Sequence, residues 1–199
     1  WKMKVHPGYD PKSGGGGNSA NRVNAYNVKF DARKALGDWS GKAWYSNAFD
    51  DANWDTPAEK GSANSNPWGT LVKRAIPQWN DRGLTNYETL SLKSNKAQVN
   101  LPFKNTTDSL VVIKAKLPFN QQITPYLKVN STAGKTIVAD MDNSFNMLKG
   151  TYITKDGVQA FESYSWINGH YVEYTIPPGV EVLELKYRWT VVGEMTGTF

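Results

Sequence analysis

From Tyr87 onward, short runs of alternating apolar and polar residues follow one another along the chain, separated by turn residues. Side chains point to opposite faces of a strand in turn, so this alternation predicts strands with one buried face. Such strands at a spacing of about 8–12 residues are typical of a β-sandwich. We therefore predict an all-β fold, a β-sandwich or jelly roll of short antiparallel strands. The expected strands are Tyr87–Leu92, Ala97–Phe103, Leu110–Leu117, Ile123–Asn130, Thr136–Met141, Gly150–Thr154, Val158–Ser165, His170–Ile176 and Val182–Val192.

The first part of the chain is less regular. Residues 1–24 include a run rich in Gly and Ser and are expected to form a flexible segment. Residues 25–199 are expected to form the sandwich module, with an irregular, aromatic-rich part at 25–86 and the regular strands at 87–199. In and just before the irregular part, Val23–Phe30 alternates and is expected to be a strand, and Thr70–Ile76 is expected to be a strand that ends at Pro77.

The segment ESYSWINGHYVEY, Glu162 to Tyr174, contains the strongest local signal of a hairpin. Asn168-Gly169 between two alternating runs is typical of a two-residue type I′ turn, because both residues tolerate a positive φ. The register that follows predicts two faces. One carries Glu162, Tyr164, Trp166, Tyr171 and Glu173, and the other, expected to face the core, carries Ser163, Ser165, Ile167, His170, Val172 and Tyr174.

The first of these faces combines flat aromatic rings with oxygen acceptors. Sugars present C–H faces that stack on rings and hydroxyls that need hydrogen-bond partners, so such a face suits a carbohydrate. Cross-strand aromatic pairs that only stabilise the sheet are the alternative, and the hairpin alone favours it. The candidate carbohydrate-binding residues are Trp166, Tyr164, Tyr171, Glu173 and Asn168, with Trp44 and Tyr45 as a possible wall.

Composition narrows the function classes. The 199 residues carry a net charge of +5, but Lys and Arg are spread singly, which argues against nucleic-acid binding. Eight Trp residues are an excess over what a sandwich core needs and favour a carbohydrate ligand. The absence of cysteine excludes disulfides and thiolate chemistry. No apolar run approaches the ~20 residues of a membrane span. The sequence from Trp1 onward shows no signal-peptide pattern, which says nothing about the compartment.

The sequence gives less support to a catalytic or a metal-binding function. Glu162 and Glu173 share the predicted face and lie at a separation that a glycosidase pair would permit, but carboxylates on a solvated sheet face are common. Oxygen ligands for calcium are available at Asp140, Asp142 and Asn143, although an Asx turn is favoured there. Asp50, Asp51 and Asp55 are equally expected to form turns, and His6 and His170 are too far apart in sequence to indicate a zinc site. No cofactor is expected, with calcium left open.

Several strings resemble one family. They are PWGTLVKRAIPQW (Pro67–Trp79), LPFNQQITPYLKV (Leu117–Val129), YITKDGVQAFESYSWINGHYVEYTIPPGVEVLELKYRWT (Tyr152–Thr190) and GEMTGTF (Gly193–Phe199). Together they are similar to the β-rich region of bacterial α-L-rhamnosidases, which are large glycoside hydrolases. FDDANWD (Phe49–Asp55) is similar to a turn found in accessory β-sandwiches of glycosidases.

The resemblance implies a non-catalytic portion of such an enzyme. In that family this region precedes an (α/α)₆ barrel that carries the acidic catalytic residues, and nothing in this sequence resembles the barrel. The expected function is a carbohydrate-binding module of a plant-polysaccharide-degrading enzyme, secreted, periplasmic or at the cell surface, with pectin among the expected ligands. The alternative is a structural sandwich that packs against the barrel and has no ligand. The expected partners are a plant polysaccharide or oligosaccharide and the barrel of the parent enzyme, not nucleic acid or a membrane.

Overall fold

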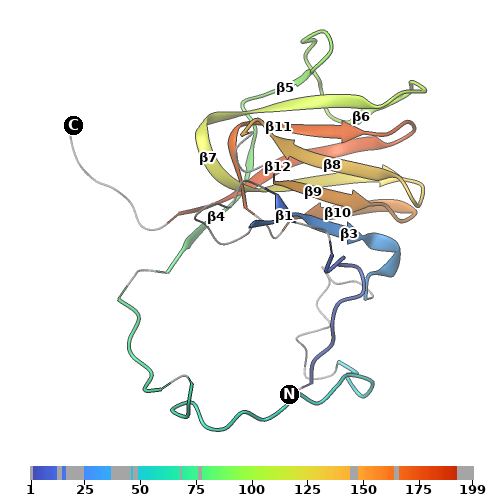
Figure 1. The fold of residues 1–199 in the computed structure, drawn as a ribbon. Coiled ribbons are helices and arrows are strands. Elements are labelled where there is room, and N and C mark those ends of the chain that lie inside the picture. Colours follow the sequence, from blue (N-terminus) through green and yellow to red (C-terminus); the bar gives the residue numbers. More distant parts are fainter. Residues whose placement is uncertain are drawn as a thin grey trace, which may run out of the picture.

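The computed structural model of the chain consists mainly of β-strands. It describes residues 2–12, 15–16, 25–36, 46, 49–67, 69–75, 78–143, 148–163 and 166–191. Ten strands join in one sheet that curls into two facing layers, so the predicted all-β sandwich is confirmed (Figure 1). In the described part of the chain, no helix is long and apolar enough to cross a membrane.

The first layer contains six strands in the order β5, β7, β11, β8, β9 and β3. All neighbours are antiparallel except β3 and β9, which run parallel. A short 3₁₀ turn, η1 (Ala32–Lys34), follows β3. The strands are β3 (Val28–Asp31), β5 (Thr89–Leu92), β7 (Val111–Ser131), β8 (Thr136–Met141), β9 (Lys149–Ile153) and β11 (Ile167–Ile176).

The second layer is formed by β10, the later half of β7, β12 and β4, with the short β6 also paired to β12. All of these pairs are antiparallel. Two further short strands, β1 and β2, form a separate two-stranded sheet. The strands not yet given are β1 (Gly15–Gly16), β2 (Ala25–Tyr26), β4 (Asn80–Asn86), β6 (Phe103–Lys104), β10 (Gly157–Glu162) and β12 (Glu181–Val191).

One long ribbon connects the two layers. The 21-residue strand β7 bends from the first layer into the second (Figure 1), and β10 and β11 follow it in antiparallel register along nearly its whole length. The pairing changes near the bend: residues 117–120 of β7 lie where the register shifts opposite His170, between the pairs Gly169–Gln121 and Tyr171–Lys116. Bulges of this kind let strands change sheets at the corner of a sandwich.

The core lies between the layers and follows the alternation of the strands. In β11, for example, Val172, Tyr174 and Ile176 are fully buried and the residues between them are not. Aromatic contacts cross from one layer to the other: Tyr174 and Tyr187 both contact Tyr87. The Tyr87 and Tyr174 hydroxyls lie 2.8 Å apart and satisfy one another. Burial of such side chains contributes about 1.5–3 kcal/mol each to folding.

Several expected strands differ from those observed. Leu110–Leu117 and Ile123–Asn130 are a single strand, because the polar residues between them form a bulge and not a turn. Ala97–Phe103 makes only an isolated bridge at Gln98 before β6 begins. Residues 70–75 form no strand, whereas Asn80–Asn86 forms β4. As an edge strand, β4 needs only hydrogen bonds to β12 and few apolar side chains, which hid it in the sequence.

The predicted hairpin at Asn168-Gly169 is wrong. Both residues lie inside β11, where they pair with Gln122 and Gln121 of β7, and neither has a positive φ. His170 was expected on the core side, but its side chain is 59% exposed because the register shift opposite it breaks the alternation. Val172 and Tyr174 do face the core, as expected.

Residues 49–67 and 69–75 lie outside both layers, where their trace forms an open excursion (Figure 1). A compact turn at its start places Trp54 edge-on to Phe49, 5.4 Å between ring centroids, and Asp55 pairs with Met3. From residue 56 to residue 75, the described residues form no strand or helix, and nearly all of them are exposed.

Candidate functional site

The structure divides the predicted carbohydrate-binding residues between two places. Tyr171 and Glu173 lie on the outer face of the first layer, and Trp166 lies at the corner between the layers, just before β11 begins. Five residues of extended chain, at most about 16 Å, separate Trp166 from Tyr171. Asn168 is half-buried opposite Gln122. Tyr164, Trp44 and Tyr45 lie outside the described residues.

The first-layer pair is already engaged by neighbouring cations. The Lys114 ammonium lies 3.7 Å from the centroid of the Tyr171 ring and covers one of its faces. Glu173 accepts a 2.6 Å ion pair from Lys93. These contacts leave less free aromatic and acceptor surface here than the sequence predicted.

Trp166 instead contacts Trp79, a residue that sequence reasoning did not place in the site. Their ring centroids lie 4.2 Å apart with the planes at 57°, and the residues are 39% and 51% exposed. Trp79 directly precedes β4, so the contact joins positions 87 residues apart in the chain. No local sequence signal could have found this pair, because it depends on the strand order β4–β12–β7–β11.

The register indicates where the two indoles lie. Arg188 of β12 pairs with Thr124 of β7, and Thr190 pairs with Asp81 of β4, so these side chains share the outer face of the second layer. Trp79 is two residues before Asp81 and extends over the same face. Three strand spacings, about 14 Å, separate the strands that carry the indoles, a gap that two tryptophan side chains meeting at 4.2 Å can bridge.

A charged network centred on Arg188 lies on this face. The guanidinium donates to both carboxylate oxygens of Glu162 on β10, the second contact at 3.0 Å, and to Asp81 on β4 at 2.7 Å. The Gly83 amide, at 2.8 Å, and Arg188 lower the pKa of Asp81. Glu162 keeps the pKa of Arg188 above its usual range. One side chain on β12 thus links β4 on one side with β10, which lies beyond β7, on the other.

Tyr126 continues the same face, one outward position beyond Thr124 on β7 and directly opposite Glu162. Its ring is partly exposed, and burial raises the pKa of its hydroxyl. Glu184 on β12 accepts from Lys128 at 3.0 Å and from Lys186 at 2.8 Å. We call this face the Trp79–Trp166 surface; its members are Trp79, Trp166, Tyr126, Arg188, Glu162, Asp81, Glu184, Lys128 and Lys186.

The structure does not bring the possible glycosidase pair together. Glu162 lies on the second layer and is held by Arg188, whereas Glu173 lies on the first layer and is held by Lys93. The register that placed them on one face depended on the hairpin, which does not form.

The carboxylates considered for calcium have local structural partners. Asp142 Oδ1 accepts from the His170 and Tyr171 amides at 2.7 and 3.1 Å, and Asp140 accepts from the Met141 amide at 2.8 Å. Asp50 accepts from the Ala52 amide at 3.0 Å. Across the described ranges, no three His, Asp or Glu side chains gather as metal ligands would.

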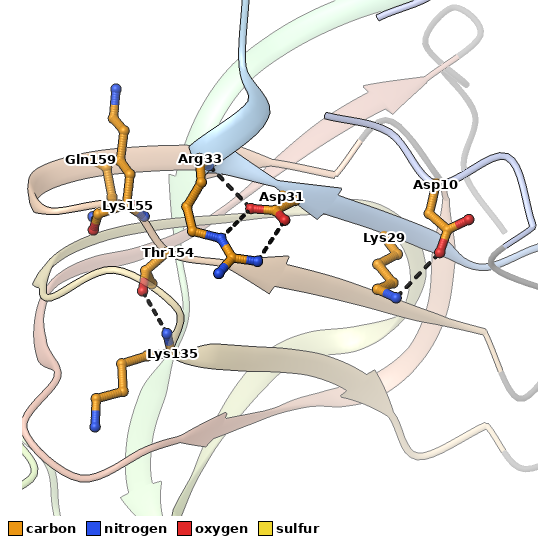
Figure 2. Close-up of polar contacts among 8 residues, drawn as sticks. All are labelled: Asp10, Lys29, Asp31, Arg33, Lys135, Thr154, Lys155 and Gln159. Atoms are coloured by element: carbon orange, nitrogen blue, oxygen red, sulfur yellow. Dashed lines mark hydrogen bonds and ion pairs between the residues drawn. The ribbon is translucent and has the colours of Figure 1, made fainter. Parts of the chain in front are cut away.

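Basic side chains also gather around β3 and two adjacent turns, but they do not form a joint site. Arg33 is bound to Asp31 at 2.9 and 2.8 Å, and Lys29 to Asp10 at 3.2 Å. In Figure 2 the side chain of Lys135 extends away from that of Lys155, so their ammonium groups do not converge on one point.

One solved structure shares this fold over most of the chain. An α-L-rhamnosidase from Dictyoglumus thermophilum has a similar structure over 85% of this chain and 20% of its own, with a TM-score of 0.54 and 17% identity. A GH78 family rhamnosidase of Bacillus sp. GL1 aligns over 43% of this chain and 10% of its own, with a TM-score of 0.40 and 16% identity. No family model matches the sequence, and neither does any curated protein.

The chain therefore has the fold of a part of an α-L-rhamnosidase structure, as the resemblance implied, and it spans about a fifth of that chain. The described residues of the chain form strands and one 3₁₀ turn and contain no catalytic barrel.

Proposed function

We propose that the chain is a non-catalytic carbohydrate-binding module of a secreted or cell-surface glycoside hydrolase that degrades plant polysaccharide, and that it binds sugar on the Trp79–Trp166 surface. The observation that carries the proposal is the contact between two partly exposed indoles, 4.2 Å apart, beside a network of carboxylates and a guanidinium. The proposal moves the site from the predicted hairpin face to the second layer and keeps Trp166.

The chemistry of this surface matches that of a sugar. Indole and phenol rings offer apolar faces for the C–H side of a pyranose, and their polar edges still accept or donate hydrogen bonds. Glu162 and Asp81 retain lone pairs that can accept hydrogen bonds from sugar hydroxyls. Arg188 retains N–H groups, beyond those used in the network, that can donate to sugar oxygens. Because Arg188 fixes both carboxylates before a ligand arrives, little side-chain freedom remains to be lost on binding.

Affinity electrophoresis on a panel of plant polysaccharides tests the proposal. Retention by one class is expected, and Trp79→Ala and Trp166→Ala should each weaken it at least tenfold while the far-UV spectrum stays that of the parent. Phe119→Ala is the matched control, because Phe119 is a 53% exposed aromatic residue that contacts Trp189 instead of the indole pair. Equal loss in the control, or none in the Trp variants, would reject this surface as the site.

The same screen with and without EDTA tests whether calcium takes part in sugar binding. We propose that binding needs no metal, so retention should not change when EDTA is added. A loss that added Ca²⁺ restores would contradict this part of the proposal.

A second function, a structural sandwich that packs against the catalytic barrel of a parent enzyme, is favoured by a separate observation. The described residues between 56 and 75 are exposed with few exceptions, and two apolar side chains, Leu71 and Val72, are 68% and 86% exposed. Exposed apolar residues of this kind are typical of a segment that contacts another part of a protein. No retention by any polysaccharide would favour this function over sugar binding.

A further inference from the structure

The charge pattern of the Trp79–Trp166 surface differs from that of the whole chain. The chain carries +5, which on its own would favour an acidic polymer. On this surface, three cations (Arg188, Lys128 and Lys186) face three carboxylates (Glu162, Asp81 and Glu184). The local charges therefore sum to zero.

Each of these cations is also bonded to a carboxylate. Arg188 is shared by Glu162 and Asp81, and Glu184 is shared by Lys128 and Lys186 at 3.0 and 2.8 Å. If the ring of a uronic acid stacked on the indoles, its carboxylate would lie beside Glu162 and Asp81. These like charges would repel one another. A hydroxyl meets no such penalty, because it can accept from the guanidinium and donate to the carboxylates.

The spacing of the rings sets the length of the ligand. Ile167 pairs with Ile123, so Trp166, directly before it and in contact with Trp79, lies level with Thr124 on β7, and Tyr126 is the next outward position on that strand. That step is about 7 Å, slightly more than one sugar ring. A ligand that contacts both the indole pair and Tyr126 must contain at least two adjacent rings.

We infer that the Trp79–Trp166 surface binds two adjacent rings of an uncharged polysaccharide and discriminates against uronic acids. The inference rests on the proposed function and adds the class of ligand to it. It leads away from the acidic backbone of pectin and toward neutral side chains or neutral cell-wall polymers.

The test compares neutral polymers (arabinan, galactan, xylan, β-glucan) with acidic ones (polygalacturonate, rhamnogalacturonan, alginate) in affinity gels at 0.05 and 0.5 M NaCl. Retention is expected on a neutral polymer, with less than a twofold change between the two salt concentrations. On oligosaccharides of that polymer, the disaccharide should bind at least tenfold more tightly than the monosaccharide, and Tyr126→Ala should remove that difference.

Other outcomes separate the inference from the proposed function. One such outcome is that acidic polymers are retained, that salt weakens their binding, and that Trp79→Ala abolishes it. In that case the surface binds sugar, but the inference is wrong. Retention of any polymer that is unchanged in both Trp variants overturns the inference and the proposed site together, and no retention at all overturns the proposed function with it.

A charge variant gives an independent check. Asp81→Asn with Glu162→Gln keeps the shape of the network and leaves Arg188 and both lysines with one neighbouring carboxylate, Glu184. The double variant should gain at least fivefold in retention on polygalacturonate, and this gain should disappear at 0.5 M NaCl. A folded double variant without any such gain would mean that the local carboxylates do not exclude uronic acids.

Discussion

Gly169 shows why a dipeptide typical of turns occurs inside a strand. A Cβ atom at this position would overlap the Asp142 carboxylate, closer than side-chain atoms are found in proteins. The absence of a side chain lets Asp142 reach past the strand to the His170 and Tyr171 amides, where the register shifts. Glycine is needed here for a close approach and not for a positive φ.

Gly169→Ala should destabilise the fold by about 2 kcal/mol, because either Asp142 or the strand must move. Measured by urea unfolding, the loss should shrink in the double variant Gly169→Ala/Asp142→Ala, where the added methyl group no longer meets a carboxylate. Thr175→Ala, on the outer face of the same strand, is the control and should have a small effect. Additive losses in the double variant would show that the two residues do not interact.

The Asp142 carboxylate gives the fold a pH dependence with a definite sign. Burial alone would raise its pKa, but hydrogen bonds from the His170 and Tyr171 amides and from the His170 ring outweigh burial and lower it below the usual 3.8. A depressed folded-state pKa means that the stabilisation is fully present above the unfolded value and is lost as the pH falls through the folded value.

Asp142→Ala should therefore destabilise the protein by about 1–2 kcal/mol at pH 6, and the difference from the parent should decrease below pH 3.8. Chemical unfolding at several pH values measures this. A difference that stays constant from pH 6 to pH 3 would mean that the carboxylate charge contributes nothing.

At the scale of elements, the ribbon formed by β7 with β10 and β11 determines both the fold and the site. At the bend, the partner of β7 changes from β11 in the first layer to β10 in the second. Trp166 follows β10 and precedes β11, so it lies at the corner and not on a hairpin. The second layer then depends on side-chain contacts across its outer face, in which Arg188 joins β10, β12 and β4. This network supports the position of the edge strand that precedes Trp79.

Arg188→Ala should lower stability by about 1 kcal/mol, toward the upper end for exposed ion pairs, because its contact with Glu162 is bidentate. Arg188→Lys should recover only part of the loss, since an ammonium cannot make two parallel bonds to one carboxylate. Thermal unfolding at low and high salt measures both variants, and equal stability of the lysine variant and the parent would argue against a bidentate role.

The sequence predicted the sandwich because alternation is a local property: Val172 and Tyr174 face the core as expected. It could not distinguish a turn from a bulge, since polar and small residues such as Asn168 and Gly169 are compatible with both. The candidate site was harder to predict than the strands, because the contact of Trp79 with Trp166 depends on strand order. Trp166 was selected because it lay on the face that was expected to be exposed. The sequence did not point to Trp79, Tyr126 or Arg188.

At the scale of the whole molecule, the sandwich and the segment of residues 56–75 differ in how they are held. The strands are fixed by ladders of hydrogen bonds on both layers. In residues 56–75, by contrast, the described backbone hydrogen bonds connect residues within the segment, as in those from Ser65 to Ser62 and from Gly69 to Ser65. Such exposed backbone is the preferred substrate of proteases.

Trypsin should therefore cut first after Lys60, Lys73 or Arg74, before any strand lysine such as Lys128. The N-terminal fragment carries β3, which pairs with β9, so both fragments should elute together in gel filtration and separate only on a denaturing gel. Mass spectrometry at early times identifies the sites. Early cleavage at Lys128, or separation of the fragments without denaturant, would contradict this account of the fold.

The same digestion discriminates between the two proposed functions when a catalytic portion is present. If residues 56–75 pack against that portion, cleavage at Lys73 and Arg74 should slow at least tenfold in the longer polypeptide, because the protease reaches only segments that open. Leu71→Ser/Val72→Ser should restore rapid cleavage by removing the apolar contact, while the sugar affinity of the Trp79–Trp166 surface stays the same. Rapid cleavage in both contexts would leave the segment without a partner in the enzyme, and the exposed indoles would remain the feature that distinguishes this sandwich.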